Sequence, residues 1–249
     1  MIKLTRDELL EDLSIGGSHG NLEKWLFKTC EGKILFVKNR SSQDSLEPES
    51  EVCSYHLALL LGVQAIPQYF ASASWLSPLK LSASYDFSHG QDCVSLFRYA
   101  RKTLGLNFSL TQGESRYKAI CSLLTENDKI LHDSTLALDY IIGNPDRHLR
   151  NFELRNTDLV EAFDFGESLF SKGLIPLNTL KANPYERYHK KQFRLLTNLQ
   201  FNPYVKIVDD VSIKIVLKEY LPRNKVSALY EFVIKNYHAV IEYLDRRKI

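Results

Sequence analysis

The sequence predicts an α+β fold of two lobes, a small β-rich lobe over residues 1–88 and a mainly helical lobe over residues 89–249. Short apolar runs separated by turn-type residues dominate the first part, whereas helical periodicity begins at Val94. The end of the chain carries a wide apolar stripe at helical spacing, which predicts a long helix with one face in the core. This stripe consists of Val226, Leu229, Tyr230, Val233, Tyr237, Val240, Ile241 and Leu244.

The first lobe is expected to contain an early β-hairpin. Trp25–Lys28 and Ile34–Lys38 are apolar extended runs, and the Gly-Lys pair at 32–33 between them is typical of a turn. Ala65–Phe70 and Leu79–Tyr85 are candidates for further strands of the same lobe.

A helix is expected after this hairpin, and it carries a partner for Lys38, the last residue of the second run. Apolar residues recur at helical spacing over residues 52–60, and a glycine follows as a fitting stop. Glu51, in the first turn of this helix, can reach back to Lys38 as an ion pair. Glu47 and Glu49 are alternative partners, and the competing interpretation of Glu51 is simply a favourable carboxylate at a helix N-terminus.

The segment from Gly143 to Gly166 carries most of the functional information. It reads GNPDRHLRNFELRNTDLVEAFDFG and contains Asp146, then Asn151, and then Asp164 at the start of an Asp-Phe-Gly triplet. A kinase needs this order of groups, because a D-x-x-x-x-N loop supplies a base and a metal ligand, and the later aspartate bridges metal to phosphates. Either motif alone is more often structural, since Asn-Pro-Asp is also a common turn and short triplets occur by chance.

The residues between these two motifs predict a hairpin. Asn151–Leu154 and Leu159–Phe163 are short extended runs, and residues 155–158 form a turn-type cluster. Such a hairpin would bring the amide of the first motif and the carboxylate of the triplet side by side, so that three oxygen-bearing side chains converge. Together with Lys38 as a lysine for nucleotide phosphates, the pattern predicts a phosphotransfer site.

A glycine-rich segment precedes the first hairpin. Gly16, Gly17 and Gly20 lie close together, with Ser18 among them. Glycines let the backbone approach phosphate oxygens and point N–H groups at them. A flexible connector is the commoner explanation of such a segment, but its position directly ahead of the hairpin that carries Lys38 favours phosphate binding.

Together these motifs resemble those of the HipA-like serine/threonine kinase family, in a short form that consists of the kinase part alone. The central Gly-Asn-x-Asp-Arg-His-x-x-Asn-Phe string is rather specific to that family and its close relatives, whereas eukaryotic protein kinases place a His-Arg pair before the aspartate. The chain departs from the family in a slightly longer glycine-rich loop and in a triplet closer to that of ordinary protein kinases. The matching positions are Ser14, Ile15, Gly17, Glu23, Lys24, Lys38, Gly143, Asp146, His148, Asn151, Phe152, Phe163 and Asp164.

The resemblance implies a protein-kinase-like fold, ATP and Mg²⁺ as cofactors, and a role for each main residue. Asp146 would accept a proton from the attacking hydroxyl group or orient it. Asn151 and Asp164 would ligate Mg²⁺, whose preference for oxygen suits amide and carboxylate groups. Lys38 would hold the phosphates, positioned by Glu51, so that catalysis is mostly alignment and charge neutralisation.

The glycine-rich loop (Gly16, Gly17, Ser18 and Gly20) and His148 are the remaining expected nucleotide contacts. Two roles for His148 are equally consistent with the sequence: a structural hydrogen bond within its own loop, or a contact to substrate or phosphate. In the family, the serine of the Ser-Ile motif can be autophosphorylated, which switches the enzyme off; this points to Ser14, with Ser18 as a second candidate. A phosphate there would compete for the N–H donors that should cradle ATP, although a serine that merely caps a turn is the alternative.

Composition limits the partners that we expect. Lys plus Arg total 32 against 30 for Asp plus Glu, so the net charge of +2 gives no reason to expect direct nucleic-acid or membrane binding. The four cysteines are widely spaced without a C-x-x-C pair, which predicts free thiols and argues against a zinc site. The N-terminal residues lack a secretory signal and no apolar run approaches about 18 residues, so a cytoplasmic location is expected.

Three classes of function remain open on the sequence. The resemblance favours a protein kinase acting on serine or threonine of a protein substrate; relatives include toxins of toxin–antitoxin pairs, so a small DNA-binding antitoxin is a candidate partner. A separate protein could also supply the N-terminal subdomain that long relatives carry. A small-molecule or lipid kinase on the same scaffold is the second class, since fold and ATP site do not fix the acceptor. The third, a non-catalytic binding module, is disfavoured because Lys38, Asp146, Asn151 and Asp164 are all present.

Overall fold

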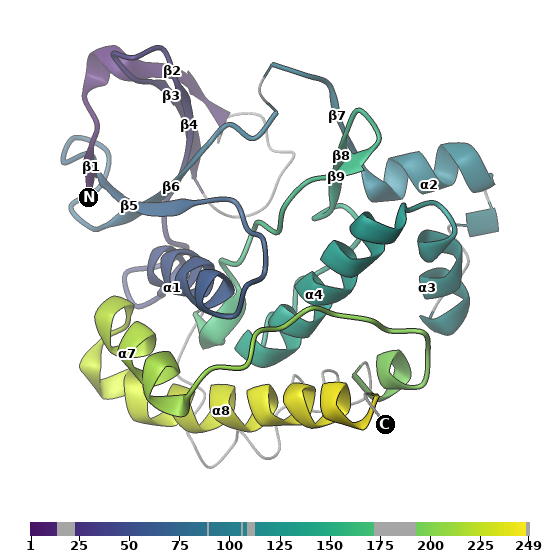
Figure 1. Ribbon diagram of the computed structural model, residues 1–249. Coiled ribbons are helices and arrows are strands. Elements are labelled where there is room, and N and C mark those ends of the chain that lie inside the picture. Colours follow the sequence, from purple (N-terminus) through teal and green to yellow (C-terminus); the bar gives the residue numbers. More distant parts are fainter. Residues whose placement is uncertain (14–22, 89, 106, 109–112, 172–192, 248–249) are drawn as a thin grey trace.

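Six strands of the N-terminal part form one curled sheet in the order β1-β5-β6-β4-β3-β2 (Figure 1). β1 runs parallel to β5, and the other neighbours are antiparallel. The computed structural model of the chain describes residues 1–13, 23–88, 90–105, 107–108, 113–171 and 193–247. The strands are β1 (Ile2–Lys3), β2 (Leu9–Asp12), β3 (Lys24–Lys28), β4 (Ile34–Lys38), β5 (Gln68–Ser72) and β6 (Leu81–Tyr85), with a short 3-10 helix, η1 (Arg6–Glu8), before β2.

The predicted hairpin that ends at Lys38 is present as β3 and β4, joined by a turn in which Gly32 has a φ of +80°. Alternate side chains of a strand point to opposite faces of the sheet. Leu35 and Val37 of β4 are fully buried in the apolar core that the sheet encloses, whereas Phe36 and Lys38 share the opposite face. The two-residue period of the strand therefore sets which way the lysine points.

The two further predicted strands are also present, with shifted starts. β5 begins at Gln68 rather than at Ala65, because Pro67 has no N–H group to donate to a neighbouring strand. Ala65 instead makes an isolated parallel bridge with Ala162, in the segment that follows β9 (Asp158–Leu159). β6 begins at Leu81, two residues later than expected.

One helix, α1 (Glu47–Leu60), follows β4 and lies between the sheet and the helical part of the chain (Figure 1). It contacts β5, β6 and the helix α7 (Asp210–Tyr220). It begins earlier than the sequence pattern indicated, since Pro48 is well suited to the first turn of a helix. Glu51 therefore lies in the second turn, and its interpretation as a first-turn carboxylate is wrong. Gly62, with a φ of +71°, follows the end of the helix as expected.

The C-terminal part is mainly helical and carries a small sheet in the order β7-β8-β9 (Figure 1). Val94, expected to open the helical region, lies in β7 and pairs with β8; the first helix starts after Ser95, whose side chain caps it. No helix in the described part of the chain is long and apolar enough to cross a membrane. The elements are β7 (Cys93–Ser95), α2 (Leu96–Leu104), α3 (Gly113–Cys121), α4 (Glu126–Ile142), β8 (Glu153–Arg155), β9 (Asp158–Leu159), η4 (Ser168–Phe170), α7 (Asp210–Tyr220) and α8 (Arg223–Arg246). A strand-rich first part and a helical second part confirm the predicted α+β class.

Two helices, α4 and α8, carry much of the core of the helical part. α4 is capped at its start by Thr125, whose hydroxyl accepts a hydrogen bond from the N–H of Asp128, and Gly143 follows its last residue. Gly143 has a φ of +65°, and a Cβ atom there would lie 2.8 Å from the ring of Phe232, so only glycine fits this position. The predicted stripe of α8 is confirmed as core, with Val226, Leu229, Val233, Tyr237 and Val240 buried and Tyr230, Ile241 and Leu244 packed against them.

Candidate active site

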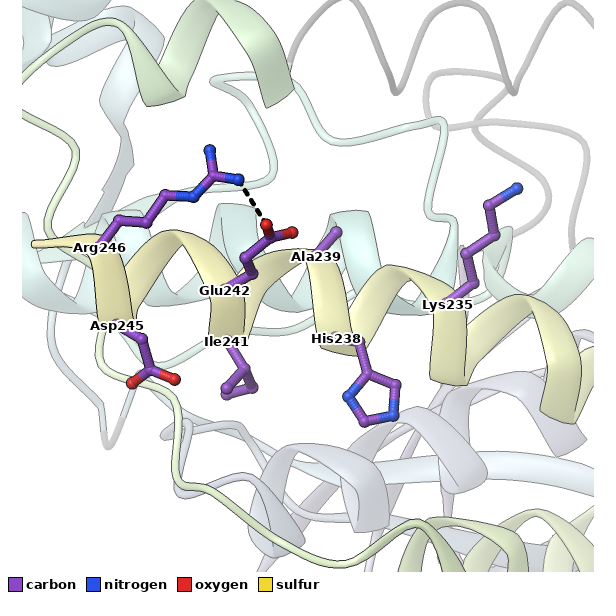
Figure 2. Close-up of a pocket in the computed structure, with 7 residues that line it drawn as sticks. All are labelled: Lys235, His238, Ala239, Ile241, Glu242, Asp245 and Arg246. Carbon is purple, nitrogen blue, oxygen red and sulfur yellow. Dashed lines mark hydrogen bonds and ion pairs between the residues drawn. The ribbon is translucent and has the colours of Figure 1, made fainter.

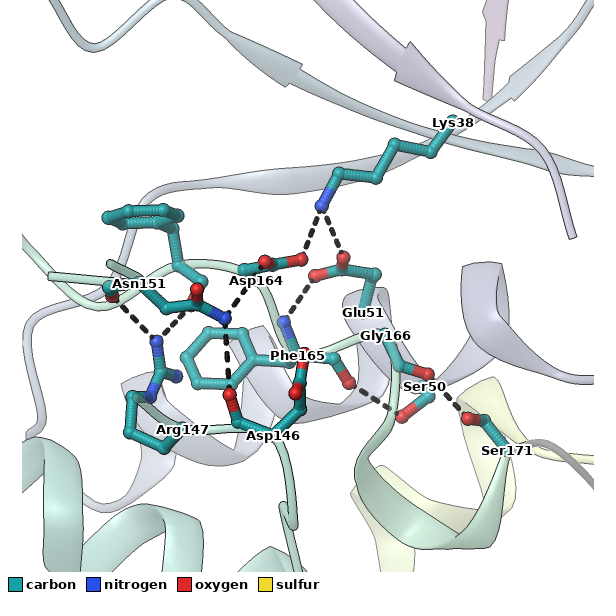
Figure 3. Close-up of polar contacts among 11 residues, drawn as sticks. Lys38, Ser50, Glu51, Asp146, Arg147, Asn151, Asp164, Phe165, Gly166 and Ser171 are labelled. Carbon is teal, nitrogen blue, oxygen red and sulfur yellow. Dashed lines mark hydrogen bonds and ion pairs between the residues drawn. The ribbon is translucent and has the colours of Figure 1, made fainter. Parts of the chain in front are cut away.

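Lys38 lies at the centre of the candidate site, where it joins the sheet to α1 and to the segment after β9 (Figure 3). Its Nζ atom is 2.8 Å from Oε1 of Glu51 and 2.8 Å from Oδ1 of Asp164. The ion pair between Lys38 and Glu51 that the sequence suggested is therefore present. β4, the helix that follows it and a segment 126 residues further along the chain therefore meet at this one ammonium group.

The two glutamates in the first turn of α1, Glu47 and Glu49, have partners other than Lys38. Glu49 pairs with Arg40, with 3.0 Å between Oε1 and Nη2, and Glu47 accepts a hydrogen bond from the hydroxyl of Ser41. Both glutamates are buried, so they are held in these contacts. Neither is the partner of Lys38, and the choice among the three glutamates is resolved in favour of Glu51.

The charges of Lys38 and Asp164 stabilise each other. Burial opposes the charge of the Lys38 ammonium, but the carboxylates of Asp164 and Glu51 outweigh it and raise the pKa of Lys38 above its usual value. The positive charge of Lys38 in turn lowers the pKa of Asp164 to about 2, against a smaller opposing effect of burial. Both groups are therefore ionised at neutral pH.

The hairpin of β8 and β9 returns the chain so that Asn151 and Asp164 meet. The two strands pair across a turn in which Asn156 has a φ of +60°, a narrower turn than the sequence pattern indicated. Asn151 precedes β8 and Asp164 follows β9, and Nδ2 of Asn151 donates a hydrogen bond to Oδ2 of Asp164 at 3.1 Å. The predicted meeting of these two side chains is confirmed.

Asp146 lies on the loop between α4 and β8. Its N–H donates to the side-chain oxygen of Asn144 at 3.1 Å, and its carbonyl oxygen accepts a hydrogen bond from Nδ2 of Asn151 at 3.3 Å. Asp146 is exposed, as is His148 on the same loop. The backbone of Asp146 is thus fixed to the amide that also contacts Asp164, while its carboxylate remains accessible to a molecule arriving from solvent.

The buried side chain of Arg147, for which the sequence motifs predict no role, connects α4 to the hairpin of β8 and β9. Its guanidinium group donates to both carboxylate oxygens of Asp139 on α4, at 2.7 and 3.1 Å. It also donates to the carbonyl oxygens of Asn151 and Phe163, at 3.0 and 2.6 Å (Figure 3). The arginine therefore ties α4 to both ends of the hairpin. The overlooked signal was Asp139 itself, an acid within the apolar run of α4, because a buried carboxylate requires a charged or hydrogen-bonded partner.

A second lysine, Lys24, lies beside Lys38. The two residues face each other in the register of β3 and β4, so their side chains share one face of the sheet. Burial and the charge of Lys38 lower the pKa of Lys24, whereas Asp164, Glu51 and Asp146 act in the opposite direction. The candidate site therefore combines two lysines with three carboxylates.

Three aromatic rings form a stack next to these charges. Phe87, in the link between β6 and β7, stacks on Phe163 with ring centroids 5.0 Å apart and on Phe36 with centroids 6.5 Å apart. Phe36 is two residues before Lys38 on the same face of β4, and Phe163 directly precedes Asp164. The stack therefore connects the face of β4 that carries Lys38 with the residue before Asp164.

The donor set fits Mg²⁺ bound together with phosphates. Asn151 and Asp164 offer an amide oxygen and a carboxylate, and Mg²⁺ commonly takes one or two protein ligands while phosphate oxygens and waters complete its shell. The amide of Asn151 turns its nitrogen toward Asp164, so it would have to turn over to present its oxygen to a metal. Among the residues that the structure describes, no group of three or more His, Cys, Asp and Glu side chains could hold a metal ion.

The glycine-rich loop lies outside the described residues. Ser14, Gly16, Gly17, Ser18 and Gly20 all belong to residues 14–22, so their predicted roles in phosphate binding and autophosphorylation stay predictions.

A shallow hollow on α8 is separate from the candidate site (Figure 2). Its described lining residues all come from α8. Among them, Nε2 of His238 is 3.2 Å from a carboxylate oxygen of Asp210 on α7, and Glu242 and Arg246 form an ion pair. None of them is a residue of the Lys38 cluster. The candidate site is therefore the cluster of polar side chains around Lys38, and the hollow on α8 is not part of it.

Comparison with solved structures shows that the chain has a kinase-like fold. The crystal structure of the Helicobacter pylori proinflammatory kinase CtkA matches 94% of this chain and 93% of its own length, with a TM-score of 0.67 and 15% sequence identity. The crystal structure of the golgi casein kinase matches 93% of this chain and 71% of its own length, with a TM-score of 0.50 and 14% identity. No protein-family model matches the sequence, and no curated protein matches it.

Proposed function

We propose that this protein is an ATP- and Mg²⁺-dependent phosphotransferase. The observation that carries the proposal is the meeting of Lys38 with Glu51 and Asp164 at 2.8 Å each, with Asn151 hydrogen-bonded to Asp164. A lysine held by a helix glutamate, beside a metal-binding aspartate and an amide, is the arrangement that aligns nucleotide phosphates in kinases. The kinase-like fold supports the same conclusion.

In this proposal each polar side chain acts by alignment or by charge. The ammonium groups of Lys38 and Lys24 would bind phosphate oxygens of ATP, and Asn151 and Asp164 would hold Mg²⁺, which supplies neutralisation of phosphate charge when bound. Asp146 would take the proton of the acceptor hydroxyl. The oxygen of that hydroxyl forms a bond to the γ-phosphorus while the bond from this phosphorus to the bridging oxygen breaks, and ADP leaves with that electron pair.

The purine base of ATP would lie against the aromatic stack. Phe36 extends the face of β4 that carries Lys38, and Phe163 precedes the metal-binding Asp164, so both rings border the position proposed for the phosphates. Phe87 lies between them, in the link from the sheet to the helical part. An aromatic surface favours stacking with a purine, because both are flat and apolar on their faces.

For the acceptor we favour serine or threonine of a protein, as in the HipA-like family. The support is the motif around Asp146 and Asn151, together with the glycine-rich loop, in which Ser14 or Ser18 would be the site of autophosphorylation. A role as the toxin of a toxin–antitoxin pair, with a small DNA-binding antitoxin as partner, follows from the same resemblance. The alternative is a small-molecule or lipid kinase, since the fold alone does not select the acceptor.

The proposal is tested by following transfer of the γ-phosphate of labelled ATP with and without Mg²⁺. Asp146→Ala and Asp164→Ala should each reduce transfer by at least about 10²-fold, because each removes a group that acts on the reacting atoms. Asp158→Ala is the matched control. Asp158 is exposed at the start of β9, so this substitution makes the same chemical change outside the site. Turnover that is independent of Mg²⁺, or equal in all three variants, would refute the proposal.

The same assay separates the two acceptor classes. When the purified protein meets labelled ATP and a cell extract, a protein kinase places the label in protein bands, whereas a small-molecule kinase places it in the protein-free fraction. Intact mass of the protein alone, compared with Asp146→Ala, reports autophosphorylation. A wild-type mass that ATP leaves unchanged would remove the proposal for Ser14 and Ser18 while leaving the acceptor question intact.

A further inference from the structure

The hydroxyl group of Ser50 holds the segment that follows Asp164. Ser50 is 1% exposed on α1, and its Oγ lies 3.0 Å from the carbonyl oxygen of Phe165 (Figure 3). The same Oγ lies 2.7 Å from the carbonyl oxygen of Ser168. A hydroxyl carries a single proton, so it is shared between these two acceptors or alternates between them. The proposed reaction uses Glu51, its neighbour in the sequence, but assigns nothing to Ser50.

The segment that Ser50 contacts has an unusual backbone. Asp164, Leu169 and Phe170 have φ values of +62°, +52° and +54°, in the left-handed region that residues other than glycine rarely adopt. Such conformations persist only where the surroundings hold them, and they concentrate at functional sites. The conformation of Asp164 decides where its carboxylate points.

The first two turns of α1 supply the contacts that hold this backbone. Glu51 accepts a hydrogen bond from the N–H of Phe165 at 2.8 Å, so Ser50 and Glu51 engage the carbonyl and the N–H of the same residue. The N–H of Leu46 donates to the carbonyl oxygen of Ser171 at 2.7 Å. Ser50 lies at the middle of these contacts and spans both ends of the turn between Phe165 and Ser168.

The C-terminal end of α1 is fixed to the helical part as well. His56 stacks on Tyr220 of α7, with ring centroids 4.2 Å apart and planes 9° from parallel, and the N–H of Lys206 donates to the carbonyl oxygen of Leu61 at 2.8 Å. The helix that presents Glu51 to Lys38 is therefore anchored at both ends. Because α1 is anchored at both ends, the hydroxyl group of Ser50 keeps a fixed position relative to the segment after Asp164.

We propose that Ser50 is a positioning residue of the phosphotransfer site: its hydroxyl keeps the backbone after Asp164 in the conformation that directs this carboxylate to Lys38 and to a metal ion. This inference rests on the proposed function. Without the hydroxyl, the carbonyl groups of Phe165 and Ser168 lose a donor, and the left-handed residues can relax to ordinary conformations. The carboxylate of Asp164 would then spend less time in position to bind Mg²⁺.

Ser54 provides a matched control one helical turn further along α1. It is 0% exposed, and within the described residues its hydroxyl has no hydrogen-bond partner. Ser50→Ala and Ser54→Ala make the same chemical change at equal burial on the same helix, but only the first removes a bond to the segment after Asp164. A general effect of altering buried α1 would appear in both variants.

The test measures turnover as a function of Mg²⁺ concentration, and hydrogen–deuterium exchange of the amides of residues 165–168. Ser50→Ala should need more Mg²⁺ for half-maximal turnover, lower kcat roughly 3- to 10-fold, as expected for one lost hydrogen bond, and exchange faster over residues 165–168. Ser54→Ala should match the wild-type protein in all three measurements.

Equal Mg²⁺ requirements and equal exchange in the two variants would overturn the role of Ser50. A lower melting temperature of Ser50→Ala without faster local exchange would overturn it too. If Ser50→Ala does not fold, Ser50→Cys, which keeps a weaker donor at similar size, makes the same comparison with the same two outcomes. A wild-type protein without turnover would refute the proposed function instead, and the exchange of residues 165–168 would then decide the structural role of Ser50 alone.

Discussion

At the scale of single residues, Lys38 is the group on which the other charges depend. Glu51 is 1% exposed and has two partners in the described structure, the ammonium of Lys38 and the N–H of Phe165. A buried carboxylate that loses its cation is costly, because desolvation of its charge is then uncompensated. The lysine that we expect to bind ATP phosphates is therefore also part of what holds the sheet to α1.

Replacing Lys38 separates these two contributions. Lys38→Met should reduce phosphate transfer by about 10²–10³-fold, the range for removal of one preorganised charge-stabilising donor, and should also lower the melting temperature. Adding Glu51→Gln removes the uncompensated charge, so the double variant should regain stability while staying inactive. Lys33→Met, an exposed lysine of the same hairpin, is the control and should change neither quantity. A stable, active Lys38→Met protein would contradict this account.

The low pKa of Asp164 predicts a specific dependence of stability on pH. Its pKa in the folded protein is about 2, against an ordinary value of 3.8, because Lys38 stabilises the charged form. A group whose pKa is depressed by folding contributes stability that is complete above its unfolded pKa and lost as pH falls through its folded pKa. The contribution of Asp164 is thus lost between about pH 4 and about pH 2.

Chemical unfolding between these pH values, compared with Asp164→Asn, measures that contribution. The wild-type protein should lose free energy of unfolding more steeply than the variant as the pH falls over this range. The difference should be modest, because the side chain of Asp164 is 38% exposed and solvent screens its charge. Parallel loss of stability in the two proteins would show that Asp164 is not held by Lys38 in solution.

At the scale of elements, the sequence reveals strands and helices whose apolar residues follow a simple pattern. The apolar run of β4 after a Gly-Lys turn predicted that strand, and the apolar stripe of α8 predicted a helix with one buried face. The start of α1 was misplaced for the opposite reason. Its first turns bury Glu47, Glu49 and Glu51, and a sequence pattern treats such residues as solvent-exposed because their cations come from elsewhere in the chain.

The same limit explains which parts of the candidate site were predicted. Asp146, Asn151 and Asp164 belong to motifs with recognisable spacing, and Lys38 ends an apolar run that follows a turn, so all four could be identified without coordinates. Ser50 acts through backbone carbonyl groups of another segment, and such acceptors leave no trace in the sequence. Arg147 had one signal, its partner Asp139 within the apolar run of α4, but its contacts to backbone carbonyl groups could not be foreseen. The choice of Glu51 among three glutamates likewise depended on the direction in which each points from α1.

Arg147 is expected to be the main structural link between α4 and the hairpin of β8 and β9. Arg147→Met should destabilise the protein by about 3–5 kcal/mol, because it leaves the buried carboxylate of Asp139 without its cation. Asp139→Asn combined with Arg147→Met should recover part of this loss, and a double-mutant cycle of the free energy of unfolding measures the coupling. Additive effects of the two substitutions would contradict a direct ion pair.

At the scale of the whole molecule, the candidate site is assembled from both parts of the chain. Lys38 comes from the sheet, whereas Asp146, Asn151 and Asp164 come from the loop and hairpin that follow α4. α1 lies between the two parts and contacts both (Figure 1). The likeness to the kinase CtkA covers 94% of this chain, so the shared fold extends over both parts.

A crystal structure of the protein with Mg²⁺ and a non-hydrolysable ATP analogue tests the central claim most directly. We expect phosphate oxygens against Nζ of Lys38, and Mg²⁺ at about 2.0–2.1 Å from oxygens of Asn151 and Asp164, the usual distance for this ion. Asp146 should face the γ-phosphate. A nucleotide bound elsewhere, or phosphates and metal that leave Lys38 and Asp164 paired only with each other, would contradict the proposed phosphotransfer site.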